Sequence, residues 1–238
     1  MVHSDFSENF AYVAQDAAPR FHYNIDQCTV LPVVVYYRTE NGIEHFSVVL
    51  LSDCSTHDAT AVYIMQQKLI PEIRRRCKLV KKIIYVSDGA KQHFKNRVQM
   101  LNYMKHEEEF GIPTEWHSHA TAHGKGSCDG IGAIVKREAT RASLQASPND
   151  AILDAYSLFS CAKGRSFEME FSFYSQQDHD KTRKFLERRF KNAPPVTKIQ
   201  KKHSFLPQPS QHYMFSVTVG LQLLWQLYHI TSMMDMSH

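Results

Sequence analysis

The amino-acid sequence predicts an α/β protein in which helices pack on a mixed sheet. Strand-like and helix-like patterns alternate through residues 1–145, and this order is typical of a mixed α/β sheet. The 238 residues suit one large domain or one domain with an appendage. With 43% hydrophobic and 22% charged residues, the composition excludes collagen-like, coiled-coil and wholly disordered chains. The net charge of +4 permits an anionic partner without requiring one.

Three predicted strands open the sheet. A short strand is expected at residues 2–6, and residues 28–37 and 45–51 are rich in β-branched and aromatic side chains. Asn41-Gly42 lies between the last two strands and is a strong signal for a hairpin turn. We therefore expect these two strands to form a hairpin.

A helix is predicted next, after polar N-cap candidates at residues 53–58. Apolar side chains recur every three or four residues and predict one buried face, formed by Val62, Met65, Leu69, Ile73 and Cys77. Pro71 lies within this pattern, and we expect it to break or bend the helix because proline lacks the backbone donor.

A continuously apolar strand at residues 82–87 is of the type found in the centre of a sheet, and it ends at Asp88. Three elements are expected after it: a helix ending at Phe110, a strand at residues 114–119 and a helix at residues 128–144. This order completes a predicted core at residues 1–146.

A small β-α-β unit is predicted at residues 147–206. Phe167, Met169, Phe171 and Phe173 alternate with polar residues, as in a half-buried strand, and a helix at residues 181–190 and an extended stretch to Phe205 follow. Residues 207–238 are expected to form an irregular or aberrant tail.

No membrane anchor or leader is expected. Asp5 introduces charge before any apolar run, and the apolar segment at residues 215–234 is interrupted by Gln222, Gln226 and His229. The five cysteines are scattered, odd in number and without a CxxC pair. These features predict a reduced, intracellular chain, nuclear or cytoplasmic.

Three aspartates lie where this order of elements places functional groups. Asp5 is in the first strand, Asp88 ends the central strand, and Asp129 begins the helix after a glycine-rich turn. If the first and central strands are neighbours, their carboxylates converge at one edge of the sheet, and the helix can add the third. Close carboxylates repel one another and attract hard cations, so we expect two Mg²⁺ or Mn²⁺ ions. Such ions can activate a nucleophile and stabilise the leaving oxygen of a phosphodiester.

Each aspartate also has a structural interpretation, as a turn residue or a helix cap. Glu138 is an alternative third acid, about half a rotation from Asp129 on the same helix. A zinc site formed by His117, His119, His123 and Cys128 is a weaker alternative, because the spacing matches neither HExxH nor a paired CxxC finger.

Several segments together resemble a known family: residues 5–10 (DFSENF), 87–90 (SDGA), 94–96 (FKN), 106–111 (HEEEFG), 121–132 (TAHGKGSCDGIG) and 135–137 (VKR). They resemble the transposon-derived proteins of animals that have an RNase H-like, DDE-type transposase core. The resemblance covers about residues 3–206 and is most specific at Cys128-Asp129-Gly130-Ile131-Gly132.

This resemblance, together with the order of elements, implies an RNase H-like mixed five-stranded sheet. It also implies metal-dependent DNA strand cleavage and transfer, with DNA as partner. We assign the catalytic and metal-binding triad to Asp5, Asp88 and Asp129. The start only four residues before Asp5 leads us to expect a truncated fragment of a mobile element. A non-catalytic, domesticated or decayed DNA- or protein-binding module is therefore the alternative function.

Basic residues near the predicted site are candidates for phosphate contacts. Lys91, Lys95 and Arg97 follow Asp88, and residues 72–82 and 163–202 are also basic. His123 and Lys125 are expected to orient phosphate. A P-loop is excluded, because Gly126 stands where that motif needs Ser or Thr. A homo-oligomer is compatible with the sequence.

Overall fold

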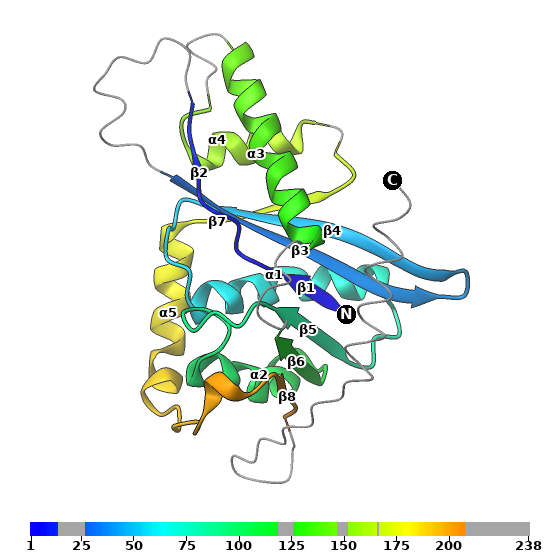
Figure 1. Cartoon of the computed structure of the whole chain (residues 1–238), viewed down its shortest axis with the longest axis vertical. Coiled ribbons are helices and arrows are strands. Elements are labelled where there is room, and N and C mark those ends of the chain that lie inside the picture. Colours follow the sequence, from blue (N-terminus) through cyan, green and yellow to red (C-terminus); the bar gives the residue numbers. More distant parts are fainter. Residues whose placement is uncertain (14–26, 119–125, 147–151, 166, 208–238) are drawn as a thin grey trace.

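The computed structural model describes residues 1–13, 27–118, 126–146, 152–165 and 167–207. Within these residues the chain is an α/β protein with a mixed sheet and helices on both faces (Figure 1). The predicted fold class is confirmed. Parallel and antiparallel strands flanked by five α-helices, counted over the described ranges, are consistent with an RNase H-like fold.

Five strands form the centre of the sheet, in the order β4-β3-β1-β5-β6. Their bounds are β1 Val2–Ser4, β3 Gln27–Thr39, β4 Gly42–Ser52, β5 Ile83–Ser87 and β6 Thr114–Ser118. The long strands β3 and β4 form the predicted antiparallel hairpin, in which Thr39 pairs with Gly42. Strand β1 lies between antiparallel β3 and parallel β5, and β6 continues parallel to β5.

Short strands extend this central sheet on both sides. Strand β7 (Glu170–Tyr174) pairs parallel with β4, and β8 (Ser204–Phe205) pairs antiparallel with β6. Strand β2 (Phe10–Ala11) pairs with β3. The region at residues 147–206 has the predicted order of strand, helix and strand, but β7 and β8 lie at opposite edges of the same sheet. Both short strands cover edges that would otherwise expose unpaired backbone groups.

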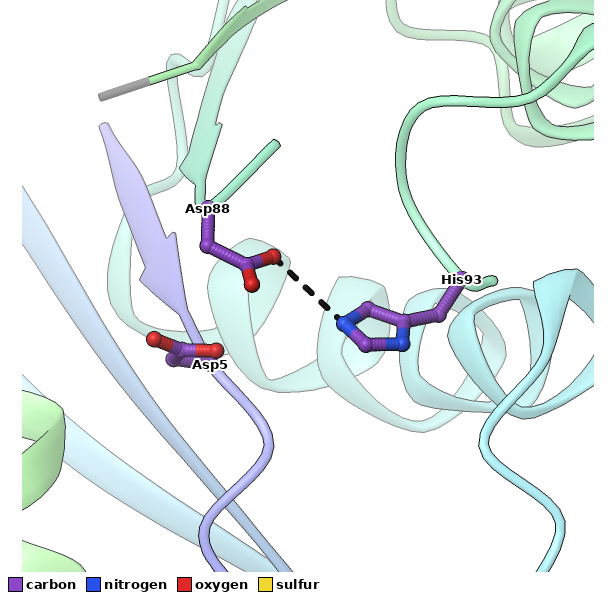
Figure 2. Close-up of side chains that lie close together, drawn as sticks. All are labelled: Asp5, Asp88 and His93. Atoms are coloured by element: carbon purple, nitrogen blue, oxygen red, sulfur yellow. Dashed lines mark ion pairs between the residues drawn. The ribbon is translucent and has the colours of Figure 1, made fainter. Parts of the chain in front are cut away.

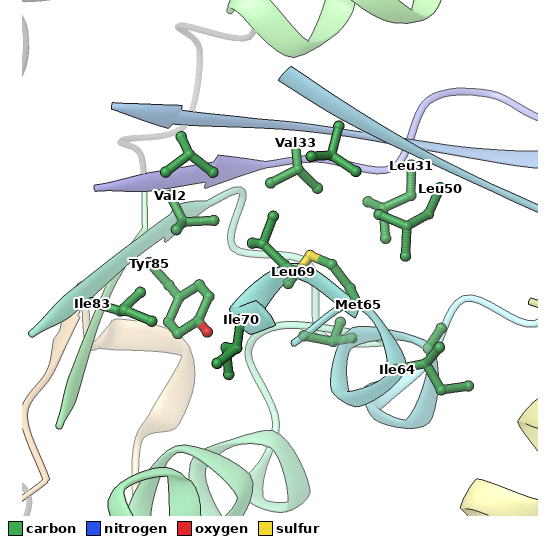
Figure 3. Packing of buried hydrophobic residues seen from close by; sticks show 14 of the residues in the cluster. Val2, Leu31, Val33, Leu50, Ile64, Met65, Leu69, Ile70, Ile83 and Tyr85 are labelled. Carbon is green, nitrogen blue, oxygen red and sulfur yellow. The ribbon is translucent and has the colours of Figure 1, made fainter. Parts of the chain in front are cut away.

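The helices form two layers around the sheet (Figure 1). Helices α1 (Ala59–Arg76), α2 (Arg97–Phe110) and α5 (Gln176–Lys191) lie on one face, and α3 (Ser127–Gln145) and α4 (Ala155–Lys163) on the other. One apolar cluster packs between the sheet and each helix layer, because alternate residues of β3 and β4 point to opposite faces. In Figure 3, Val33 and Leu50 of the sheet face Met65 and Leu69 of α1.

Two helices differ from the sequence prediction. Pro71 neither ends nor shortens α1, which runs unbroken for 18 residues. Pro71 and Gln67, whose carbonyl loses its helical donor, are both exposed, so the missing hydrogen bond lies on the solvent side. Helix α4 is an additional element, and the carboxylate of its N-cap Asp154 accepts a hydrogen bond from the Ser157 amide at 2.8 Å.

All five cysteines are free. Over the described ranges, no helix combines the length and the apolarity that crossing a membrane requires. The apolar segment at residues 215–234 lies outside these ranges.

Candidate metal centre at the carboxyl edge of the sheet

Asp5 and Asp88 meet at one edge of the sheet, as their positions at strand ends predicted. Strands β1 and β5 are parallel neighbours in which Val2 pairs with Tyr85 and His3 with Val86. The first residues after these strands are Asp5 and Asp88, so the register brings both carboxylates to the same level. Figure 2 shows the two side chains close together at this edge.

His93 joins the two aspartates from the segment between β5 and α2. Its Nε2 lies 3.4 Å from Oδ1 of Asp88, and one ligand atom from each of the three side chains lies within 4.8 Å of the others (Figure 2). The Phe6 ring lies edge-on to the imidazole at 4.7 Å between centroids, and Phe94 does so at the same distance. These aromatic contacts fix the position of His93. This histidine is not among the metal ligands that the sequence predicts.

The electrostatics of this cluster favour a bound cation. Burial, followed by the nearby charges of Asp88 and Asp129, raises the pKa of Asp5 to about 6, and His93 acts in the opposite direction. The carboxylate of Asp5 is therefore destabilised by its surroundings at neutral pH. A divalent cation would offset this repulsion and provide a partner for both carboxylates.

The imidazole of His93 contacts Asp88 as an ion pair but forms no hydrogen bond among the described residues. The side chain is only 7% exposed, and neither ring nitrogen has a hydrogen bond to any residue of the described ranges. Buried polar atoms are rarely left in this state. Two carboxylate oxygens and one imidazole nitrogen form a donor set that fits a divalent cation, and the nitrogen favours Mn²⁺ over Mg²⁺. We call Asp5, Asp88 and His93 the edge cluster.

Asp129 lies outside the edge cluster. Its exposed carboxylate accepts a hydrogen bond from the Gly126 amide at 3.0 Å and so caps the first turn of α3. Gly126 allows this turn to approach β1, because a Cβ at that position would lie 2.6 Å from Cε1 of His3. Asp129 is near enough to raise the pKa of Asp5, but the structure shows it as a helix cap. Glu138, the alternative acid, pairs with Arg165 at 3.7 Å.

Two residues of the alternative zinc site, His117 and Cys128, lie in the described part of the chain and contact other groups. Nδ1 of His117 lies 2.9 Å from the Ser204 hydroxyl oxygen, and the Cys128 thiol donates to the His3 carbonyl at 3.5 Å. His119 and His123 lie outside the described ranges, as does Lys125. Among the described residues, the group of side chains that could hold a metal ion is the edge cluster.

The basic candidates after Asp88 have different environments. Lys91 and Arg97 are exposed, and Arg97 begins α2 beside a groove formed with α5. Lys95 is buried, and burial lowers the pKa of its ammonium group. The three basic candidates of this segment are thus one surface lysine, one arginine at a groove and one buried lysine.

The fold and the edge cluster define an α/β protein with a candidate divalent-cation site at the carboxyl edge of its sheet. The chain belongs to the family described as domain of unknown function DUF8701, whose model matches residues 1–217. No curated protein and no solved structure matches the chain.

Proposed function

We propose that this chain is a metal-dependent nuclease core of the DDE transposase type, which cleaves and transfers DNA strands. The observation that carries this proposal is the edge cluster, in which Asp5 and Asp88 end adjacent parallel strands and His93 faces them. Its support also includes the mixed sheet and the segments that resemble transposon-derived proteins.

In this proposal Asp5, Asp88 and His93 hold one Mg²⁺ or Mn²⁺ ion. The bound metal would activate the attacking water or hydroxyl and stabilise the leaving oxygen of a phosphodiester. Asp129, which acts electrostatically on Asp5, is the nearest further acid that a second ion could use. The complete triad of Asp5, Asp88 and Asp129 stays a prediction.

A basic groove between α5 and the start of α2 supports DNA as the substrate. The groove is lined by residues of α5 together with Arg97 at the start of α2. Its two acids are already engaged: Asp180 accepts a hydrogen bond from Gln176 at 2.9 Å, and Glu187 pairs with Lys191 at 2.6 Å. Arg97, Arg183 and Lys184 form no salt bridge among the described residues, and Phe190 adds an aromatic surface. Such a groove suits a phosphate backbone.

Calorimetric titration with Mn²⁺ tests the metal site directly. We expect the parent chain to bind and Asp88→Asn to lose at least about 100-fold in affinity, because it lacks a ligand rather than an outer-sphere partner. Glu107→Gln is the matched control, since it removes an exposed carboxylate of α2 distant from the strand ends. In Mn²⁺, the parent and Glu107→Gln should nick supercoiled DNA, and Asp88→Asn should not.

A non-catalytic DNA-binding module is the second candidate function. The observation that favours it is the exposed, capping position of Asp129, which leaves two carboxylates in the edge cluster. This candidate predicts DNA binding that weakens with added salt and no cleavage in Mg²⁺ or Mn²⁺. Cleavage that Asp88→Asn abolishes would exclude it.

A further inference from the structure

Lys95 is an unusual lysine because it is buried without a partner. The residue is only 4% exposed, and its ammonium forms no hydrogen bond or ion pair with any residue of the described ranges. Lysines are almost never buried unless an anion or several acceptors compensate the charge. The missing compensation among these residues makes the ammonium a candidate for binding an anion.

The backbone holds Lys95 firmly in this position. Its amide donates to the Ala90 carbonyl at 2.9 Å, and its own carbonyl accepts a hydrogen bond from Gln200 at 3.1 Å. The preceding Phe94 is 1% exposed and belongs to the main apolar cluster. The inward direction of the Lys95 side chain is therefore a consequence of packing rather than of a mobile surface loop.

The ammonium lies at the carboxyl edge of the sheet, beside the edge cluster. A Cβ built on Gly89 would lie 3.7 Å from Nζ of Lys95 and 4.0 Å from Cβ of Ser118. Gly89 directly follows Asp88, and Ser118 ends β6, the next parallel strand. Since glycine leaves this space open, the ammonium reaches the strand end next to a candidate metal ligand.

Asp5 and Asp88 of the edge cluster are the acids next to this position, at the ends of the central strands β1 and β5. Residues 119–125, which follow Ser118 in the sequence, contain no Asp or Glu. Cation, carboxylates and imidazole thus gather at one edge. Phosphodiesters carry the oxyanion that both a divalent cation and an ammonium can contact at once.

We propose that Lys95 binds a non-bridging oxygen of the substrate phosphodiester, beside the ion held by Asp5, Asp88 and His93. This inference rests on the proposed function and assigns Lys95 the recognition of the phosphate that is to be cleaved. It differs from a general surface contact with DNA, for which Lys91 and Arg97 are placed.

Lys95→Met tests this role because it keeps the length of the side chain and removes the charge. The probes are inorganic phosphate and a labelled single-stranded DNA, titrated in Ca²⁺. We expect at least about a tenfold loss of affinity for both, as one charge-assisted hydrogen bond is lost. The control Lys105→Met, a lysine of α2 that pairs with Glu108 at 2.6 Å, should change affinity by less than about twofold.

Two further measurements separate this role from a structural one and from the metal site. Lys95→Met should melt at the same temperature as the parent or higher, because an unpaired buried charge is removed. It should also bind Mn²⁺ as tightly as the parent or tighter. Unchanged phosphate and DNA affinity would overturn the inference, and so would a lower melting temperature together with lost Mn²⁺ binding. If the parent itself bound no Mn²⁺, the proposed function would fail, whereas a loss of phosphate binding in Lys95→Met would still support the anion site.

Discussion

Two buried histidines, His106 and His93, lie in the same region of the chain and have opposite environments. His106 is fully buried in α2, with Nε2 2.9 Å from the Tyr85 hydroxyl oxygen and Nδ1 2.7 Å from the Ile112 carbonyl oxygen. His93 is nearly as buried, yet neither nitrogen has a hydrogen bond among the described residues, and two carboxylates lie nearby. One histidine completes the core, and the other is left available for a ligand.

This difference distinguishes a histidine that stabilises the fold, His106, from one that is a candidate metal ligand, His93. Both ring nitrogens of His106 have partners within the core, and burial lowers the pKa of His106 to about 4, so this ring stays neutral near neutral pH. At the edge cluster, in contrast, the His93 nitrogens form no hydrogen bond among the described residues, and burial and nearby charges raise the pKa of Asp5. The gathering of two carboxylates and such an imidazole at strand ends is thus the feature that distinguishes the candidate site from the packed interior.

The largest expected effect comes from removing His106, whose two ring nitrogens both have hydrogen-bond partners. His106→Ala should lower the free energy of unfolding by about 3–4 kcal/mol, because it opens a cavity and leaves the Tyr85 hydroxyl and the Ile112 carbonyl without partners. Urea denaturation measures this loss. His45→Ala, on the exposed part of β4, is the control and should change stability by less than about 0.5 kcal/mol. Mn²⁺ affinity of folded His106→Ala should match the parent.

The two regions also predict opposite responses to pH. For His106 the folded pKa of about 4 lies below the value of 6.5, so the unfolded chain takes up the proton first and stability falls on acidification through this window. For Asp5 the folded pKa of about 6 lies above 3.8, so the folded chain keeps its proton longer and stability falls as pH rises through 6. Each shift corresponds to about 3 kcal/mol.

The variant Asp5→Asn separates these opposing contributions. In EDTA it should gain stability over the parent progressively between pH 4 and 6, by up to about 3 kcal/mol at pH 7, and Mn²⁺ should stabilise only the parent. The variant should retain the acid sensitivity due to His106. A difference between variant and parent that does not change with pH would show that Asp5 is not strained in the free protein.

The sequence predicted two of the three residues of the edge cluster and missed the third, His93, for a physical reason. Asp5 and Asp88 end apolar strands, and a strand end is recognisable from local hydrophobicity. His93 reaches them only through a turn and through contacts with Phe6, from a distant segment. The edge positions of β7 and β8 depend likewise on pairing with distant strands. Element order is local information, whereas the site is closed by contacts between segments far apart in sequence.

An intermediate effect is expected at His93, whose ring nitrogens have no hydrogen bond among the described residues. His93→Phe keeps the aromatic contacts with Phe6 and Phe94 but removes both nitrogens. Mn²⁺ affinity should fall about 10- to 100-fold, while stability stays within about 1 kcal/mol of the parent. His57→Phe is the matched control, since His57 stacks on the same Phe6 ring at 4.3 Å and lies outside the edge cluster. Equal Mn²⁺ affinity in both variants would remove His93 from the site.

The smallest effect is expected at Asp129, whose two interpretations can be separated. Asp129→Gln keeps an acceptor for the Gly126 amide at the start of α3, and Asp129→Ala removes it. As a helix cap, Asp129 should contribute about 0.5–1 kcal/mol, lost in the alanine variant and largely kept in the glutamine variant. Because its carboxylate is exposed and outside the edge cluster, both variants should bind the first Mn²⁺ within about threefold of the parent. A loss of about tenfold or more in Asp129→Gln, with stability kept, would instead make Asp129 a ligand of that ion and restore the predicted triad.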